Sequence, residues 1–121
     1  MRQLITEFPN QMRDAWNVVE NSPIDLEGFT PRGALILGMG GSGISGVIAS
    51  RMLAATSPVP IQANSDYSIP GWVGADTLVI ACSYSGNTEE TLIALKMAQE
   101  RGARIVAITS GGQLGELADQ H

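Results

Sequence analysis

The sequence predicts an α/β fold, a three-layer sandwich in which helices cover both faces of a Rossmann-like parallel sheet. Three short apolar runs, at 34–37, 78–82 and 105–108, lack polar alternation, which is typical of strands buried on both faces. Helical patterns separate these runs, and strand–helix alternation implies parallel strands joined by right-handed crossovers. Hydrophobic residues make up 44% of the 121 residues, which favours a folded core over a disordered chain.

The elements follow in order from an N-terminal helix. Residues 3–21 repeat apolar side chains at three- and four-residue steps, and Pro9 is placed in the first turn of the main helical segment. A weaker strand, at 59–63, lies among prolines. Further helices are expected at 43–55, 88–101 and 114–120. The first of these carries its large apolar residues on one side: Ile44, Val47, Ile48, Met52 and Leu53.

Two parts of the chain differ in composition. We expect an N-terminal helical extension at 1–32 and one α/β domain at 33–121. Four strands are fewer than in most doubly wound sheets, which have five or more. Either the domain is small, or the sequence is a fragment that stops inside the strand–helix alternation and leaves the sheet truncated at its C-terminal end.

Charge and cysteine content exclude several classes of protein. A net charge of −5, with seven scattered Lys and Arg residues, argues against a nucleic-acid partner. No apolar run reaches the roughly 18 residues that span a bilayer, so no membrane partner is expected. The single Cys82 rules out an internal disulfide and suits the cytoplasm. Cys82 and His121 cannot supply the three ligands of a zinc site, so we expect no metal and no cofactor.

A glycine-rich loop follows the first apolar strand and opens the next helix. It reads LGMGGSG at 37–43, and Gly38, Gly40 and Gly43 satisfy the dinucleotide pattern G-x-G-x-x-G. Missing Cβ atoms let backbone N–H groups approach an anion at the helix N-terminus. A tight strand-to-helix turn would use the same glycines. Because no lysine follows them, the loop is not a nucleotide-triphosphate P-loop.

A second loop, rich in hydroxyl groups, occupies the same position after the next buried strand. In the segment CSYSGNTEET, Ser83, Ser85 and Thr88 bring three hydroxyls close together in the sequence. Hydroxyls and helix N–H donors suit a phosphate monoester. Helix capping is the alternative, since Asn87 with Glu90 fits a capping box, but capping explains only part of the set. Both loops lie at the carboxyl edge of a parallel sheet, where ligands bind.

Other polar and aromatic residues favour structural roles. Asp66 is read as a turn residue rather than a sugar-hydroxyl acceptor. Cys82 closes an apolar strand and is read as a buried, inert thiol. Tyr84 has the position of a residue that borders a ligand, and the loop at 109–112 either lines the sugar or forms a plain turn. Core or interface positions are expected for Trp16, Tyr67 and Trp72.

Together the two loops resemble the sugar isomerase (SIS) domain family. The segments DYSIPGW at 66–72, AITSGGQL at 107–114 and FPNQ at 8–11 add to the similarity, which covers nearly the whole chain. The full serine-rich string is most similar to that of the bifunctional phosphoglucose/phosphomannose isomerases. The resemblance implies an SIS-type sandwich, with Gly41 and Ser42 binding a sugar phosphate. It also implies that Ser83, Ser85 and Thr88 hold the phosphate group.

Enzymes of this family convert glucose 6-phosphate or mannose 6-phosphate to fructose 6-phosphate through an enediol, and they act as dimers. Their glutamate, histidine and lysine lie downstream of the position that matches His121. We therefore expect a chain that binds hexose 6-phosphate, forms a homodimer and contains no catalytic residue. Two alternatives stay open. A phosphosugar-sensing module would need a basic helix-turn-helix, which 1–32 does not resemble. A dinucleotide-binding domain leaves the hydroxyl-rich loop unexplained.

Overall fold

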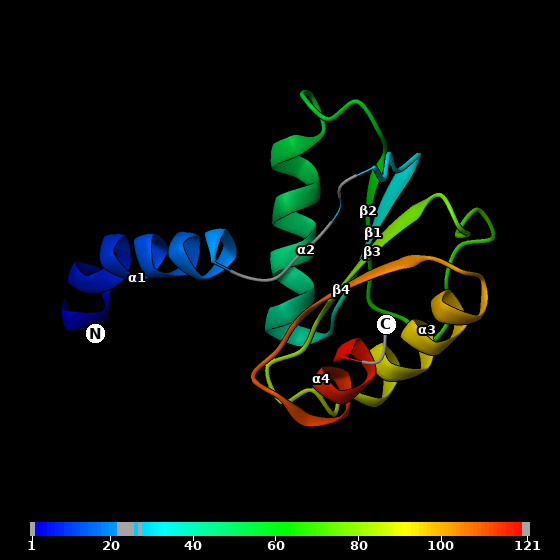
Figure 1. Ribbon diagram of the computed structural model, residues 1–121. Helices are drawn as coiled ribbons and strands as arrows, with labels where there is room; N and C mark the ends of the chain where they lie inside the picture. Colours follow the sequence, from blue (N-terminus) through cyan, green and yellow to red (C-terminus); the bar gives the residue numbers. More distant parts are fainter. Residues whose placement is uncertain (1, 22–25, 27, 120–121) are drawn as a thin grey trace.

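Four parallel strands form one sheet between two layers of helices in the computed structural model, which describes residues 2–21, 26 and 28–119 (Figure 1). The strands are β1 (Gly33–Leu37), β2 (Ile61–Asn64), β3 (Thr77–Cys82) and β4 (Arg104–Ile108). The helices are α1 (Arg2–Glu20), α2 (Gly40–Leu53), α3 (Glu89–Glu100) and α4 (Gly112–Asp119). The α/β prediction is confirmed, and each predicted element is present with ends shifted by at most three residues. His121 lies outside the described residues.

The strand order is β2-β1-β3-β4, so the chain leaves the centre of the sheet in two opposite directions. Leu37, at the end of β1, lies beside Asn64 of β2 and beside Ala81 of β3. The connection after β1 runs outward to β2, whereas the connection after β3 runs outward to β4. The carboxyl ends of β1 and β3 therefore form the topological switch point of the sheet.

The hydrophobic core lies between the sheet and the pair α3 and α4. Leu35, Leu37 and Val79 of the two central strands meet Leu95 of α3 and Leu114 of α4, and each is at most 1% exposed. Helices lie over both faces of the sheet, so unbroken apolar runs suit its central strands. All five residues of β1 are buried, whereas β3 alternates between buried and half-buried residues.

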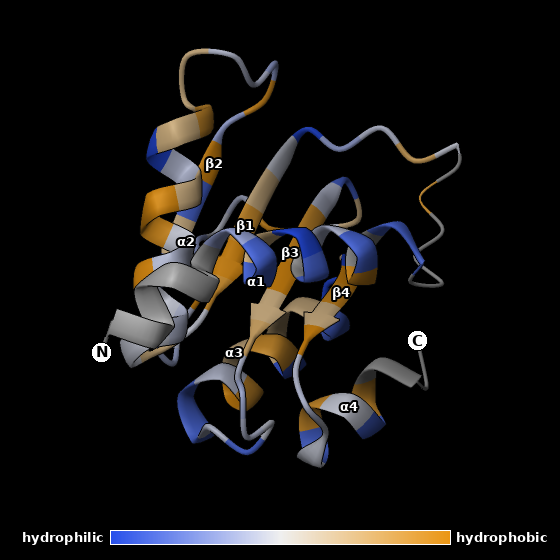
Figure 2. Cartoon of the chain, turned by 90° about the vertical axis from the view of Figure 1, so that its left-hand side faces the viewer, coloured by the Kyte–Doolittle hydropathy of each residue, from blue (hydrophilic) through white to orange (hydrophobic). Residues whose placement is uncertain are grey.

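Helix α2 covers the opposite face of the sheet through its small residues. Gly43 and Gly46 are its buried residues, and α2 packs against β2 and β1. The large apolar residues predicted on one side of this helix are exposed and point away from the sheet: Ile44, Val47, Ile48, Met52 and Leu53. Figure 2 shows hydrophobic residues along the length of α2. The helix therefore carries an apolar surface that its own sheet does not use.

Helix α1 stands apart from the α/β domain (Figure 1). Its exposed apolar side chains include Met12, Trp16 and Val18. Pro9 was expected in the first turn of a helical segment, but it lies inside the helix because α1 begins at Arg2. A proline there removes one N–H donor from the hydrogen-bond ladder. Within the described part of the chain, no helix combines the length and the hydrophobicity needed to cross a bilayer.

Candidate functional site

The two predicted loops lie next to each other at the carboxyl edge of the sheet. Residues 38–43 follow β1 and residues 83–88 follow β3, and these two strands are paired. From there α2 and α3 pass to opposite faces of the sheet (Figure 1). Diverging connections of this kind leave a crevice at the strand ends, where doubly wound proteins bind their ligands.

The glycine-rich loop places Gly41 and Ser42 in the first turn of α2. Met39 is the N-cap residue, and no side chain caps this helix. The first N–H groups of an α-helix have no partner within the helix. A Cβ atom added to Gly41 would meet no heavy atom within 4 Å, and Ser42 is half-buried. The start of α2 thus combines available N–H donors with open space.

The serine-rich loop is folded around Ser83, whose side chain is only 3% exposed. Its Oγ accepts a hydrogen bond from the Gly86 N–H at 3.1 Å and lies 2.8 Å from Thr88 Oγ1. Thr88 is the N-cap residue of α3, and its side chain makes no capping hydrogen bond. Ser85 is exposed, and its Oγ accepts from the Asn87 N–H at 3.2 Å. The structure therefore brings the hydroxyls of Ser83 and Thr88 together at a helix N-terminus, with Ser85 on the open side of the loop.

The loop after β4 holds the serine-rich loop in place through backbone hydrogen bonds. The Ser110 N–H donates to Tyr84 O at 3.1 Å, and the Leu114 N–H donates to Gly86 O at 2.8 Å. Gly86 has a φ of 73°, and a Cβ atom there would lie 1.8 Å from Gly111 O, so only glycine fits. These contacts give the third loop a supporting role, while the Tyr84 side chain is 84% exposed.

Asn87 caps a different helix from the one that its position in the sequence suggests. Its Oδ1 accepts a hydrogen bond from the Gln113 N–H at 3.1 Å, in the first turn of α4. The N-cap of α3 is Thr88, so the predicted capping box of Asn87 with Glu90 is wrong. Sequence reasoning missed the bond because 26 residues separate its two ends and the pairing of β4 brings them together.

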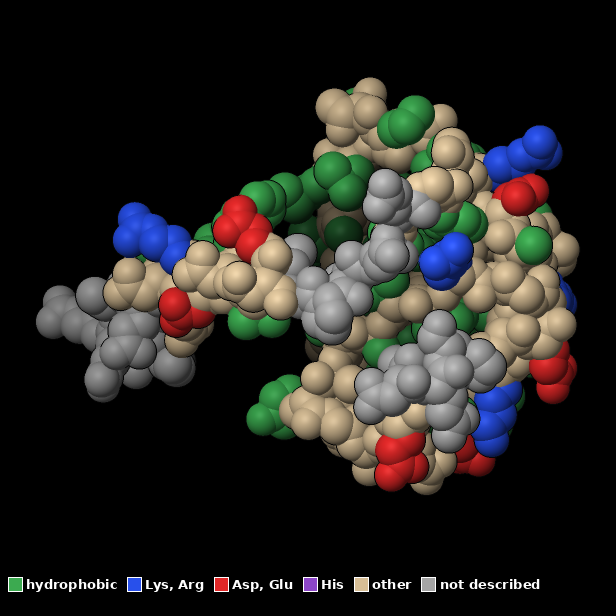
Figure 3. All heavy atoms as spheres, viewed as in Figure 1, with side chains coloured by type: hydrophobic (Ala, Val, Ile, Leu, Met, Phe, Trp, Pro, Cys, Tyr) green, Lys and Arg blue, Asp and Glu red, His purple; other side chains and the backbone are tan. Residues whose placement is uncertain are grey.

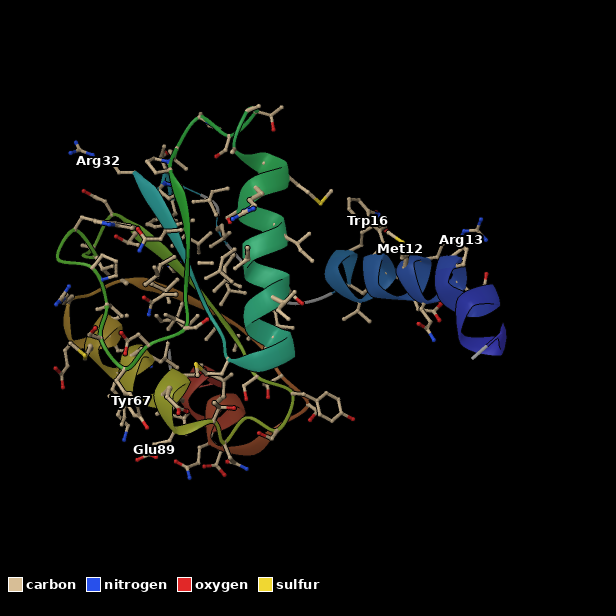
Figure 4. The ribbon with its side chains drawn as sticks, turned by 180° about the vertical axis from the view of Figure 1, so that it is seen from behind. Met12, Arg13, Trp16, Arg32, Tyr67 and Glu89 are labelled. Atoms are coloured by element: carbon tan, nitrogen blue, oxygen red, sulfur yellow. The ribbon has the colours of Figure 1, made fainter. Side chains whose placement is uncertain are left out.

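An acidic pair and a tyrosine border the same helix N-terminus. Glu89 and Glu90 occupy the first turn of α3, and Tyr67 reaches toward them from the segment after β2 (Figure 4). Desolvation, followed by the two carboxylates, raises the pKa of the Tyr67 phenol. Asp66 lies in the turn, as predicted, where its Oδ1 accepts from the Tyr67 N–H at 2.7 Å.

A half-buried thiol and a buried hydroxyl lie close to the site in sequence. Cys82 ends β3 and is half-buried, and burial raises the pKa of its thiol, so the thiol stays protonated at neutral pH. Thr91, in the first turn of α3, has a buried Oγ1 with no hydrogen-bond partner among the described residues. Thr91 could not be predicted as a buried polar group, because a helical threonine carries no signal of its own in the sequence. Nowhere in the described ranges do three His, Cys, Asp or Glu residues gather to hold a metal ion.

A hollow of about 470 Å³ lies away from these loops, at the amino ends of β1 and β3. Trp72, Arg32 and Asp76 are among its lining residues, and the last two form a salt bridge of 3.8 Å. Both charged side chains are mostly exposed, at 88% and 69%, so this ion pair adds little stability. The hollow lies at the edge of the sheet where a doubly wound fold does not place its ligand.

Comparison with known proteins identifies the family. The SIS domain family matches residues 31–121. The chain belongs to the SIS domain family. Relatives of this SIS domain include the bifunctional phosphoglucose/phosphomannose isomerase of Caldicellulosiruptor bescii, 38% identical over 120 residues, which are 99% of this chain and 35% of that protein. The resemblance found in the two loops is thereby confirmed.

Further relatives share the same region. The bifunctional phosphoglucose/phosphomannose isomerase of Thermoplasma acidophilum is 53% identical over 83 residues, which are 69% of this chain and 26% of that protein. The D-glucosamine-6-phosphate 4-epimerase of Sulfolobus acidocaldarius is 45% identical over 83 residues, which are 68% of this chain and 26% of that protein. The SIS domain described here thus spans about a third or less of the length of these curated relatives.

Solved structures share the fold. A candidate phosphosugar isomerase of Clostridium difficile matches with a TM-score of 0.82 at 21% identity, over 98% of this chain and 35% of that chain. A second candidate phosphosugar isomerase, from Bacillus subtilis, matches with a TM-score of 0.68 at 30% identity, over 74% of this chain and 29% of that chain. The first match extends over α1 as well as the α/β domain.

Proposed function

We propose that this SIS domain binds a hexose 6-phosphate, with the phosphate group at the N-terminus of α3, as part of an aldose–ketose isomerase. The observation that carries the proposal is the pair of hydroxyls on Ser83 and Thr88, 2.8 Å apart at a helix N-terminus beside the switch point of the sheet. Relatives named for phosphoglucose, phosphomannose and glucosamine 6-phosphate support the class of ligand.

In the proposed complex, neutral groups hold the phosphate. The Ser85 hydroxyl accepts from a backbone N–H and keeps its own proton free to donate. The hydroxyls of Ser83 and Thr88 share one hydrogen bond, so one proton of the pair is also free to turn toward a phosphate oxygen. The N–H groups and dipole of α3 add to this attraction. Gly41 and Ser42 are assigned to the sugar across the crevice.

The lack of basic residues in and around the two loops of the sequence sets the expected strength of binding. No Lys or Arg occurs at 33–50 or at 77–95, and Glu89 and Glu90 add negative charge beside the proposed phosphate position. A helix terminus contributes about 0.3–1 kcal/mol toward an exposed anion. We therefore expect binding in the micromolar to millimolar range.

Titration calorimetry with glucose 6-phosphate tests the proposal. We expect a dissociation constant no tighter than about 1 μM, which corresponds to −8.2 kcal/mol. Glucose, which lacks the phosphate, and NADH are the matched ligands, and neither should bind. Equal affinity for glucose and glucose 6-phosphate would contradict the phosphate assignment. Tighter binding of NADH would favour the dinucleotide alternative.

The proposed isomerisation also needs a base, because conversion of an aldose to a ketose through an enediol moves a proton from C2 to C1. Glu89 and Glu90 lie at a helix N-terminus, which stabilises their charged form, so we assign neither as the base. The pure 121-residue chain should therefore produce no glucose 6-phosphate from fructose 6-phosphate in a coupled dehydrogenase assay. Steady production proportional to the amount of chain would show that a base is present.

A further inference from the structure

The connection from β2 to β3 lies close to both loops of the proposed sugar-phosphate site. Residues 65–76 form turns and bends rather than a helix. The segment begins beside the glycine-rich loop, where a Cβ atom added to Gly43 would lie 2.9 Å from Ser65 Oγ. Two residues further on, Tyr67 lies beside Glu89 at the start of α3 (Figure 4). This connection therefore links the region of the glycine-rich loop to the N-terminus of the helix that follows the serine-rich loop.

The backbone around Tyr67 is held on both sides. Before it, Asn64 Nδ2 donates a hydrogen bond to Ser68 O at 2.9 Å and so closes the turn that contains Tyr67. After it, the guanidinium group of Arg101 donates to Pro70 O at 2.8 Å. These bonds fix the backbone near Tyr67, so its ring has a defined position relative to α3.

The first turn of α3 carries no side-chain cap. Its N-cap residue, Thr88, lies 2.8 Å from Ser83 through the two hydroxyl oxygens and makes no capping bond to its own helix. Glu89 and Glu90 follow in the first turn, and Figure 3 shows acidic side chains over α3 and α4. Carboxylates are attracted to the positive end of a helix, where they compete with a phosphate for the same N–H groups. An open N-terminus therefore requires that these side chains be held aside.

The phenol of Tyr67 is a hydrogen-bond donor close to both carboxylates. Desolvation, followed by the charges of Glu89 and Glu90, raises the pKa of Tyr67, so the phenol keeps its proton at neutral pH. Hydrogen bonds from a neutral donor to a carboxylate are stronger than those between neutral groups. Tyr67 is 43% exposed, and Glu90 is half-buried, so the contact lies at the surface of the molecule beside the helix N-terminus.

We propose that Tyr67 is a positioning residue for the sugar phosphate, whose hydroxyl holds the carboxylates of Glu89 and Glu90 beside α3 and keeps the N–H groups of the first turn open. The inference rests on the proposed function, because it requires a phosphate group at this helix N-terminus. Tyr67 acts through the two carboxylates and does not itself contact the phosphate.

Tyr67→Phe tests this role, because it removes the hydroxyl and keeps the ring. Calorimetry with glucose 6-phosphate should show an affinity weakened roughly 3- to 10-fold, since the released carboxylates turn toward the helix N-terminus. The matched background is Glu89→Gln combined with Glu90→Gln, in which side chains of the same size carry no charge. In that background Tyr67→Phe should change the dissociation constant less than about twofold.

Amide hydrogen exchange without ligand gives a second readout. Exchange at 89–91 should become slower in Tyr67→Phe, because carboxylates then cap N–H groups that were open, whereas a loosened structure would make it faster. Faster exchange there would overturn the inference, as would an unaltered affinity of Tyr67→Phe or an equal loss of affinity in the glutamine background. Each of these results leaves the proposed function standing if the unchanged chain binds glucose 6-phosphate. A lack of binding by the unchanged chain would overturn both.

Discussion

Ser83 joins the backbone of its loop to the proposed ligand, so its removal should affect both. Ser83→Ala leaves the buried Gly86 N–H without its acceptor, which costs about 1–3 kcal/mol of unfolding free energy. It also removes a hydroxyl from the proposed phosphate site, and losing a hydrogen bond to a charged group should weaken affinity roughly 10- to 150-fold. Thermal unfolding and calorimetry measure the two effects.

Ser85→Ala is the matched control for this prediction. The Ser85 side chain is exposed, so its removal should change stability by no more than about 0.5 kcal/mol while still weakening glucose 6-phosphate binding. If both variants lost stability equally and bound the ligand normally, the serines would serve only to shape the loop.

Asn87 should stabilise α4 rather than α3. Asn87→Ala removes the acceptor for the Gln113 N–H, and losing a capping interaction costs about 1 kcal/mol. Amide hydrogen exchange should therefore become faster at 113–116 and stay unchanged in the first turn of α3. Asn87→Asp keeps the acceptor oxygen and should restore protection at 113–116. Faster exchange confined to α3 would contradict the structure.

At the scale of elements, the close contact of α2 with the sheet depends on Gly46. A Cβ atom there would lie 2.8 Å from Ile36 Cγ2, so Gly46→Ala should push the helix away from β1 and cost about 1–3 kcal/mol. Gly41→Ala is the matched control in the same helix, because a Cβ atom there meets nothing within 4 Å. Chemical denaturation should separate the two variants. Equal stability would mean that the helix has room to move.

Most elements could be predicted from the sequence because the central strands are almost entirely apolar: β1 is buried along its whole length, and β3 alternates between buried and half-buried residues. Apolar and polar residues do not alternate in these strands, whereas the helices between them repeat apolar residues every three or four positions. The outward direction of the apolar side of α2 could not be predicted, because the apolar side of a helix ordinarily faces the core. The small residues Gly43 and Gly46, three apart, were the available signal that the other side of this helix approaches the sheet.

The candidate site could be predicted only in part. Both loops were found because glycines and hydroxyls cluster after buried strands, and the structure brings Ser83 and Thr88 together. The hydrogen bonds between the loop after β4 and the serine-rich loop could not be predicted. They join residues that are at least 26 positions apart, and such bonds leave no local pattern in the sequence. The switch point likewise depends on the strand order, which the alternation of elements does not specify.

At the scale of the whole molecule, Tyr67 links the segment after β2 to α3 and couples this contact to pH. Desolvation and the carboxylates of Glu89 and Glu90 raise its pKa above the ordinary value of 10.0. The folded state therefore holds the phenolic proton more tightly than the unfolded state does. The protonated Tyr67 phenol therefore contributes to the free energy of unfolding below about pH 10. This contribution is lost as the pH rises through the raised pKa of Tyr67.

Replacing the two carboxylates tests this coupling. Glu89→Gln combined with Glu90→Gln should lower the pKa of Tyr67, because the charges that disfavour the phenolate are gone. An ultraviolet absorbance titration in a Tyr84→Phe background follows Tyr67 by itself. An unchanged titration midpoint would mean that the carboxylates do not act on the phenol.

The hydrogen bond between Asn87 and Gln113 also sets an order of events during protein synthesis. Ribosomes add about 5–20 residues per second, so the 26 residues between these two positions take roughly 1–5 s to make. For that interval the serine-rich loop exists on the nascent chain without the segment that braces it. A growing chain therefore makes both central strands before the segment that holds the serine-rich loop, and we expect this loop to reach its folded form only once α4 has been made.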